Sequence, residues 1–575
     1  MNSDFENVNS HLPIYNDRIK EEQESFCTHS MDKNNSSKIS AELRNSKKSE
    51  SLFNQIVAFN KRTKDQQQRN ELGTFILLGV MFLLFVISAT GLFVMWFTEY
   101  YNDTMLSNIV LAENSETAES WKSPQPKYDT LLKVHIFNYT NIKEYLLGLE
   151  EKIKVEDIGP LTYREHTTKV NVSFNKNFTV TFRDHRSYEF LPEKSTCGQH
   201  DTFILPNVPL LTAAVKIEKM NRFKKLGATG LINSFKEDVF KRLTAHNFLW
   251  GYRDRIVALD FGTGNTHFGL LMNRNGTSVD SLQINTGVDD IRKFSTITQF
   301  NGMPTMDFWS EPECNRIDGS DASMFPPYLI ENRTQLNVFL QVLCRKVPLE
   351  FEKEVTIFDD IDALRYRTPL TVFGNPQTNL NNACYCHNTE KCLPSGVINA
   401  TKCYNGAPIY PSFPHFFSGD KEVYKHLEGI NPDANLHQTF ADIHPRFAFP
   451  IGGASRIQIN IAVQKTNLIK RQIERFEDFT ILPLIWIEIT PSDYTEEIIS
   501  KLYISTVGIN AIQLTLKYGT LLVCIVSFSL IIAASYSLNK KRLNQLEKDG
   551  EKDFTAKYDI QNAQQRVFLN EYSES

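Results

Sequence analysis

The sequence has little net charge and lacks the patterns that mark nucleic-acid-binding proteins. Its 62 Lys and Arg residues are nearly balanced by 67 Asp and Glu residues, which leaves a net charge of −5. No basic tract is accompanied by an aromatic platform on which bases could stack. We therefore exclude a nucleic-acid-binding function.

Catalytic, cofactor and metal motifs are lacking as well. No His-Glu-x-x-His spacing occurs, and His415, His437 and His444 are expected to have structural roles. The run DFGTGNT at 260–266 resembles the phosphate-binding hairpin of the actin and sugar-kinase fold. No second phosphate or metal motif accompanies it, and a glycine-rich hairpin turn explains the same residues. The sequence therefore predicts a protein that is not an enzyme and that holds no cofactor or metal.

Two long runs without a charged residue interrupt an otherwise polar chain. Residues 73–97 and 519–538 are uncharged, and each is long enough to span a bilayer as a helix. The buried helix of a soluble protein seldom runs this far without a polar face. The polar residues before the first run argue against a cleaved signal peptide. Basic residues flank both runs on the sides facing the termini: Lys61, Arg62, Lys64, Arg69, Lys540, Lys541 and Arg542.

The two runs divide the chain into five parts. By the positive-inside rule both termini lie in the cytoplasm. Residues 1–72 are rich in Asn, Ser, Lys, Glu and Gln and are expected to form a disordered cytoplasmic tail. Residues 539–575 form the second cytoplasmic tail, which has neither an acidic dileucine nor a Tyr-x-x-hydrophobic sorting signal. Residues 98–518 form an ectodomain, and the plasma membrane is the expected location.

The ectodomain has the composition of a protein in an oxidising compartment. Seven of the nine cysteines lie in it, so disulfides are favoured over a zinc site among the cysteines at 384–403. Six cysteines allow fifteen pairings, and spacing alone does not choose among them. Seven Asn-x-Ser/Thr tripeptides predict glycan acceptors at Asn102, Asn138, Asn171, Asn177, Asn275, Asn332 and Asn399.

Apolar periodicity predicts a hairpin and a helical segment within the ectodomain. Alternating Val and Phe residues predict a β-hairpin over 169–183, with a break at 175–176. Asn171 and Asn177 fall on the opposite parity, so their glycans would face water. Residues 210–243 show helical spacing, which Gly227 and Gly230 are expected to break into at least two helices.

Several motifs, taken in order, resemble one protein family. They include FNYTN at 137–141, DIGP at 157–160 and LWGYRD at 249–254, followed by a series of landmarks across 285–345. Each motif is weak evidence alone, but over about residues 121–460 the motifs occur in the same order as in that family. The chain resembles the class B scavenger receptors, a family that includes lysosomal integral membrane proteins and insect sensory neuron membrane proteins.

The resemblance implies a fold and a disulfide pattern. The fold is α+β: a large antiparallel β-barrel-like ectodomain with a membrane-distal helical bundle and an internal apolar tunnel, anchored by two transmembrane helices. The implied pairs are Cys314 with Cys384, Cys344 with Cys403, and Cys386 with Cys392. Cys197 is left over, which departs from the six-cysteine pattern of the family.

The resemblance also implies a function. The protein would bind lipids, lipoproteins or anionic particles at the membrane-distal helices and pass lipid through the tunnel. The basic residues expected to attract such ligands are Lys224, Lys225, Lys236, Lys241 and Arg242. Two alternatives stay open, a phagocytic or pattern-recognition receptor without lipid transfer and a lysosomal trafficking receptor. A homo-oligomer also stays open.

Overall fold

The computed structural model describes residues 36–123, 130–259, 266–386 and 392–571. Residues 1–35 of the expected N-terminal tail and residues 260–265 of the glycine-rich run lie outside these ranges. Contacts divide the chain into two units, which we describe separately. One unit is Met1–Ile87 with Cys524–Ser575, and the other is Ser88–Val523.

Two long helices carry the uncharged runs. Helix α1 is Ser36–Phe97 and helix α12 is Ile509–Glu571. By length and composition, each contains a stretch able to cross a membrane. The expectation of disorder up to residue 72 is wrong for residues 36–72, which are helical. Lys, Glu, Gln and Arg are good helix formers, and lengthening an existing helix avoids the cost of nucleation.

The ectodomain is built on one 13-stranded sheet with the order β10-β9-β3-β2-β1-β17-β16-β15-β13-β12-β11, to which β14 and β8 attach at β2 and β3. Neighbours along this order are antiparallel, which confirms the large antiparallel sheet. Its strands are β1 Thr130–Tyr139, β2 Ile153–Asn175, β3 Thr179–Phe190, β8 Gly276–Thr277, β9 Leu282–Asn285, β10 Ile297–Phe300, β11 Leu336–Leu340, β12 Arg345–Ile357, β13 Ile361–Arg367, β14 Leu427–Glu428, β15 Phe440–Ile443, β16 Pro450–Val463 and β17 Thr480–Pro491. Two small sheets pair β4 Thr202–Pro206 with β5 Phe240–Thr244, and β6 Tyr252–Arg253 with β7 His267–Phe268.

The strand ladder is open, with β10 and β11 at its two ends, so a closed barrel of described strands is not formed. A short segment nevertheless links the two end strands. The Ile297 N–H of β10 donates to the Gly319 carbonyl at 2.8 Å, and the Ser320 N–H donates to the Asn337 carbonyl of β11 at 2.9 Å. The ends of the sheet are therefore held together through Gly319 and Ser320.

The expected hairpin is formed by β2 and β3. Val180 and Phe182 are buried while Asn171 and Asn177 are exposed, as the alternation predicts. Phe178, of the same parity as Val180, is instead exposed, because it lies in the turn between the two strands with a positive φ. Gly159 and Pro160, which a sequence reading takes as turn residues, lie inside β2. A Cβ at Gly159 would lie 2.8 Å from the Cα of His135, so glycine permits the close approach of β1 and β2 there.

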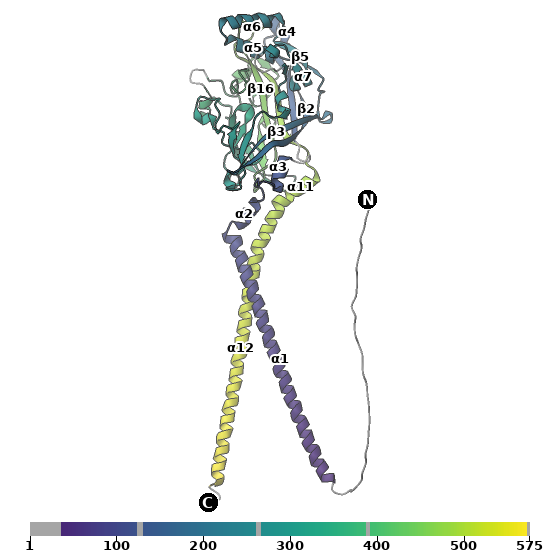
Figure 1. The fold of residues 1–575 in the computed structure, drawn as a ribbon, viewed down its shortest axis with the longest axis vertical. Coiled ribbons are helices and arrows are strands. Elements are labelled where there is room, and N and C mark those ends of the chain that lie inside the picture. The colour runs from purple at the N-terminus through teal and green to yellow at the C-terminus, as the bar shows by residue number, and fades with distance from the viewer. Residues whose placement is uncertain (1–35, 124–129, 260–265, 387–391, 572–575) are drawn as a thin grey trace. The chain divides into compact units, whose positions relative to one another are not determined.

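Short helices gather at the two ends of the ectodomain, with α4, α5 and α6 at one end and α2, α3 and α11 at the other (Figure 1). The Thr495 side chain caps α11 by accepting from the Ile498 N–H. The short helices are α2 Tyr100–Leu106, α3 Glu116–Lys122, α4 Ile142–Leu147, α5 Val208–Glu218, α6 Arg222–Ser234, α7 Ala245–Trp250, α8 Pro327–Glu331, α9 Lys421–Tyr424, α10 Ala434–His437 and α11 Glu496–Tyr503.

The segment 210–243 differs from the expectation in two respects. The break between helices falls at Asn221, which caps α6, while Gly227 and Gly230 lie inside α6. Residues 240–244 form β5 rather than helix. Pairing with β4 overrides the helical spacing there, since tertiary context outweighs local propensity.

Gly319 offers a test of the link between β10 and β11. Its φ is +140°, and a Cβ would lie 2.6 Å from the Asn337 carbonyl oxygen. We expect Gly319→Ala to lower the free energy of unfolding by about 2 kcal/mol or more, measured by thermal unfolding of the full-length chain in detergent. The control Gly227→Ala has open space around the added methyl group and should be neutral or slightly stabilising. Equal midpoints for the two variants would contradict the proposed role of Gly319.

Candidate ligand-binding surface

Helices α5 and α6 each begin at an asparagine that caps the N-terminus of the helix. The Asn207 side chain accepts from the Leu210 N–H at 3.2 Å, and the Asn221 side chain accepts from the Lys224 N–H at 3.0 Å. Such caps satisfy N–H groups that a helix leaves without partners. Helix α5 buries most of its apolar residues, whereas Ile232 is the buried residue of α6. Helix α6 therefore lies on the outside of the ectodomain.

The outer face of α6 is apolar. Phe223 is 91% exposed and Leu226 is 76% exposed, although their helical spacing predicts core positions. At about 3.6 residues per turn, Gly227 and Gly230 share this face with them. No heavy atom lies within 4 Å of a Cβ built at either glycine. Sequence reasoning missed this surface because an apolar helical stripe is normally buried.

Three of the five predicted cations are exposed. Lys224 follows Phe223 on α6, Lys236 lies just after the end of α6, and Arg242 lies on β5. No ion pair to any of the three is formed within the described ranges. Their charges therefore remain uncompensated by neighbouring carboxylates there and can attract an anionic ligand.

The other two predicted cations are neutralised by carboxylates. Lys225 donates to Glu218 at 2.5 Å. Lys241 lies 3.2 Å from Glu237 and 3.3 Å from Asp254, whose side chain is fully buried. The ammonium group of Lys241 also lies 5.0 Å from the ring centroid of Tyr252. The structure thus gives Lys241 a structural role that the sequence did not reveal.

A hollow of about 500 Å³ lies beside the end of α6. Its lining includes Phe235 together with Arg253, Asp254 and Arg255. Arg253 and Arg255 are exposed, whereas Asp254 is turned inward and accepts from the Ile256 N–H at 2.8 Å. The sequence analysis used this segment only as a family motif and missed both arginines. They add positive charge to this end of the ectodomain.

Two histidines and a tryptophan meet at Asp157 on β2. The Asp157 carboxylate lies 2.9 Å from His135 Nδ1, 2.9 Å from His415 Nε2 and 2.9 Å from the Trp486 indole N–H. Burial raises the pKa of Asp157, but hydrogen bonds from His135 and His415 outweigh it and hold that pKa well below its usual value. His415 Nδ1 accepts from the Asn431 N–H, so both ring nitrogens of His415 are engaged in contacts that hold the fold.

The two other histidines singled out in the sequence are also enclosed. The ring of His437 stacks on that of His415 with centroids 4.7 Å apart. Burial, followed by the proximity of His415, lowers the pKa of His437 to about 4. Burial, followed by the proximity of Arg446, lowers the pKa of His444 to about 4. The expected structural roles therefore fit their surroundings.

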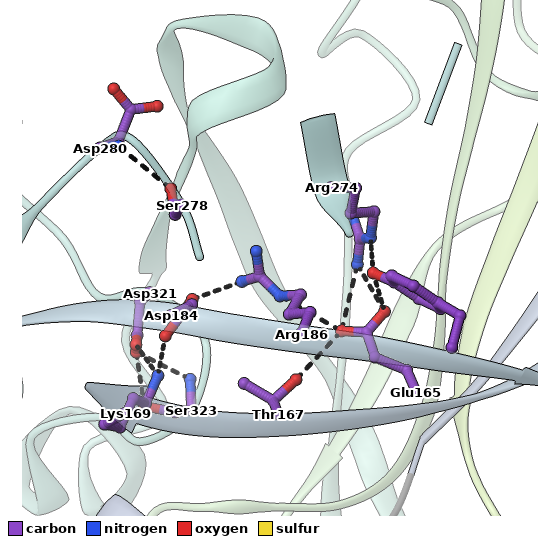
Figure 2. A network of polar contacts seen from close by, with 11 residues as sticks. Glu165, Thr167, Lys169, Asp184, Arg186, Arg274, Ser278, Asp280, Asp321 and Ser323 are labelled. Carbon is purple, nitrogen blue, oxygen red and sulfur yellow. Dashed lines mark hydrogen bonds and ion pairs between the residues drawn. The ribbon is translucent and has the colours of Figure 1, made fainter. Parts of the chain in front are cut away.

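A second polar network joins β2 and β3 to distant loops (Figure 2). Glu165 lies 3.0 Å from Arg274 and 3.3 Å from Arg186. Asp184 pairs with Arg186 and lies 2.7 Å from Lys169. Burial raises the pKa of Glu165, but the charges of Arg274 and Arg186 outweigh it, and the pKa is lowered. Because its charges pair with one another, we assign this network to the fold rather than to ligand binding.

Three disulfides lie in the segments that follow β10, β11 and β13. They are Cys314–Cys384, Cys344–Cys403 and Cys386–Cys392, the pairs that the resemblance implies. Cys197 and Cys524 are free. Within the described residues, no group of three or more His, Cys, Asp or Glu side chains is arranged to hold a metal ion.

The predicted glycan acceptors differ in accessibility. Asn171, Asn177, Asn275 and Asn332 are exposed. The other three acceptors are half-buried: Asn102, Asn138 and Asn399. The Asn138 side chain accepts from the Ile204 N–H at 3.0 Å, and that of Asn102 accepts from Arg446 at 3.0 Å. The four exposed asparagines are therefore the better candidates, and glycosylation of all seven stays a prediction.

Comparison with known proteins gives the family. The model of the CD36 family matches residues 78–535. The chain belongs to the CD36 family. It is 34% identical to mouse (Mus musculus) lysosome membrane protein 2 over 391 residues, which cover 67% of this chain and 79% of that protein. It is 32% identical to scavenger receptor class B member 1 of Cricetulus griseus over 391 residues, covering 67% and 74%.

Membership in the CD36 family accounts for the general organisation. The chain is a class B scavenger receptor relative, and with its two apolar helices it is a two-span membrane protein. The human lysosome membrane protein 2 is 33% identical over 394 residues, which cover 67% of this chain and 79% of that protein. Family members named as lysosomal and as scavenger receptors thus show comparable similarity.

The buried histidines predict that the free energy of unfolding depends on pH. An unfolded histidine binds a proton below about pH 6.5, while His437 and His444 resist protonation until about pH 4. The free energy of unfolding should therefore fall as pH decreases from about 6.5 to about 4, by up to about 3 kcal/mol for each histidine. Asp157 adds to the loss below about pH 4, because its folded pKa lies below the unfolded value.

The measurement is the unfolding midpoint of the full-length chain against pH. His437→Asn combined with His444→Asn should flatten the slope between pH 6.5 and 4, since asparagine retains an acceptor near the position of Nδ1 but does not titrate. The exposed His246, changed to Asn, is the control and should leave the slope unchanged. An unaltered slope in the double variant would show that these two histidines do not determine the pH dependence.

Removing the charge of Glu165 should lower the free energy of unfolding far more than removing the charge of the nearby Glu189. Glu165→Gln removes the carboxylate beside the half-buried Arg274, while Arg186 keeps its pair with Asp184. We expect a loss of about 3 kcal/mol in the free energy of unfolding. The control Glu189→Gln breaks the exposed pair with Arg164, 2.7 Å long, and should cost under about 1 kcal/mol. Thermal unfolding of both variants tests this, and similar midpoints would refute the structural role of Glu165.

Proposed function

We propose that this chain is a cell-surface receptor that captures lipid-bearing particles with anionic surfaces and mediates uptake of their lipid. The observation that carries the proposal is the exposure of Phe223 and Leu226 on α6, 91% and 76%. Lys224 is exposed directly after Phe223, and Lys236 is exposed two residues beyond the C-terminal end of α6. We call these four residues the α6 surface.

The α6 surface has the chemistry of a helix that binds at a lipid–water interface. Apolar side chains on one face and Lys or Arg beside them favour insertion among anionic headgroups. Burying one Phe or Leu side chain contributes about 1.5–3 kcal/mol. Exposed lysines raise the encounter rate with an anionic particle, and this effect weakens as salt increases. Arg242, Arg253 and Arg255 strengthen the positive potential of the same ectodomain.

Passage of lipid through the ectodomain is the second part of the proposal and rests on the family resemblance. An apolar conduit would spare a lipid about 0.8 kcal/mol for each CH₂ group otherwise exposed to water. The link between β10 and β11 through Gly319 and Ser320 supports a sheet that curls into a barrel-like enclosure. We further propose that both termini are cytoplasmic and that the protein acts at the plasma membrane.

A second candidate function is that of a lysosomal trafficking receptor. The similarity to lysosome membrane protein 2 favours it. Because the C-terminal tail has neither of the two sorting signals considered above, we rank it below the surface receptor. Microscopy of the full-length chain with an organelle marker distinguishes the two, since a trafficking receptor would accumulate inside the cell.

Substitutions on the α6 surface test particle capture. Phe223→Ser with Leu226→Ser should weaken binding of anionic phospholipid-coated particles by at least about tenfold, because two apolar side chains no longer insert. The control pair Val279→Ser and Leu380→Ser changes two residues that are each 82% exposed.

Lys224→Glu with Lys236→Glu should weaken binding mainly at low salt, because salt screens the attraction between the lysines and an anionic particle. The exposed Lys176 and Lys353, both changed to Glu, provide the matched control.

The same cells distinguish uptake of lipid from capture of whole particles. Particles carry a label on their lipid and a second label on their protein, and surface expression is equalised by an ectodomain antibody. Entry of lipid in excess of protein supports transfer through the ectodomain. Entry of both labels together favours a phagocytic receptor without lipid transfer. Binding that is equal for the α6 variants and their controls would overturn the α6 surface as the capture site.

A further inference from the structure

Aromatic residues mark the level at which the ectodomain meets the bilayer. Trp96 is the last residue but one of the first uncharged run, and Tyr518 precedes the second. Their ring centroids are 5.8 Å apart. The Trp96 indole N–H donates to the Lys517 carbonyl at 3.2 Å, and the ammonium group of Lys517 lies 4.3 Å from the Trp96 ring centroid. Trp and Tyr favour the headgroup region of a membrane, so this cluster lies at the outer interface.

Arg446 reaches the same region from the loop between β15 and β16. Its Nη1 donates to Asn102 at 3.0 Å, and its Nη2 donates to Asn510 at 2.7 Å and to Gln513 at 2.6 Å. The guanidinium group also lies 5.9 Å from the Tyr101 ring centroid. Arg446 thus connects α2 and the first turns of α12 with the sheet.

The charge of Arg446 has no protein counter-charge among the described residues. Its hydrogen-bond partners are neutral amides, and Glu99 accepts from the Asn102 amide rather than pairing with Arg446. Burial lowers the pKa of Arg446. Other half-buried arginines of the sheet are paired, for example Arg365 with Asp442 and Arg456 with Glu488. A half-buried cation without a counter-charge is costly, and an anion would relieve that cost.

Lys517 lies on the same face of α12 as the contacts of Arg446. Gln513 and Lys517 are four residues apart, which places them on one side of the helix and separates them by about 6 Å along its axis. Asn510 shares this side, because seven residues are close to two turns. The two cations therefore follow one another toward the uncharged run that begins at residue 519. A phospholipid whose acyl chains lie along that run would hold its phosphate at their level.

We propose that Arg446 and Lys517 bind the phosphodiester group of a membrane glycerophospholipid, with Trp96 against its glycerol and upper acyl region. The guanidinium and the ammonium donate charge-assisted hydrogen bonds to the phosphate oxygens. The bound headgroup supplies the counter-charge that Arg446 lacks and fixes the ectodomain to the bilayer surface. This site does not depend on the α6 surface, so the failure of either proposal leaves the other intact.

Native mass spectrometry of the full-length chain in detergent tests the site with dioleoyl-phosphatidylglycerol. We expect Arg446→Met and Lys517→Met each to weaken binding about tenfold, the loss expected for one charge-assisted contact. Dioleoylglycerol has the same acyl chains without phosphate, and its binding should be weaker and unchanged by either variant. Lys353→Met removes an exposed charge on β12 and is the matched control.

Several outcomes would overturn the proposal. Binding of the phospholipid by both variants at the wild-type affinity would leave Arg446 as a structural clamp only. Equal binding of inorganic phosphate and phospholipid to the wild type would assign the site to soluble phosphate. If Arg446→Met does not fold, Lys517→Met decides the matter, because it retains the contacts of Arg446 with Asn102, Asn510 and Gln513.

Discussion

The antiparallel pairing of β1 with β17 is the constraint on which the ectodomain depends. It places Thr130 opposite Pro491 and Ile136 opposite Ile485, joining the first strand after one apolar helix to the last strand before the other. Strand β17 also pairs with β16 along its length, and eight of its twelve residues are buried. Both ends of the ectodomain thus return to one place, as a chain anchored at two points in a membrane requires.

Charged residues inside the sheet have partners of opposite charge or hydrogen-bond donors, whereas several cations at the two ends of the ectodomain lack carboxylate partners among the described residues. Glu165 and Asp157 are enclosed and satisfied by several donors each, because an unpaired buried charge would cost more than the sheet could tolerate. Lys224, Lys236 and Arg446 lack carboxylate partners among the described residues. Lys224 directly follows the exposed Phe223, and Arg446 contacts the first turns of α12, where we propose that lipid headgroups approach. This contrast separates residues that hold the fold from residues available to a ligand.

The local sequence pattern predicted those elements whose tertiary contacts favour the same secondary structure. The β2–β3 hairpin follows from the alternation of apolar residues. Prediction was wrong where long-range pairing decided the outcome: residues 240–243, expected to be helical, belong to β5, which pairs with β4. The sequence predicted the basic residues of the candidate surface but not its apolar residues. It did not show that Phe223 and Leu226 are exposed, because spacing alone does not say which apolar face finds a partner.

The sequence by itself determined the two apolar spans, the family and the cysteines that pair, because these depend on composition and on the order of short motifs. Tertiary structure alone decided which charges are free. Lys241 is neutralised by Asp254, thirteen residues away, and Glu165 by Arg274, 109 residues away. Arg446 meets Asn510 and Gln513 across the whole of β16 and β17. Charge pairing depends on distance in space, and distance in space follows from strand register rather than from order along the chain.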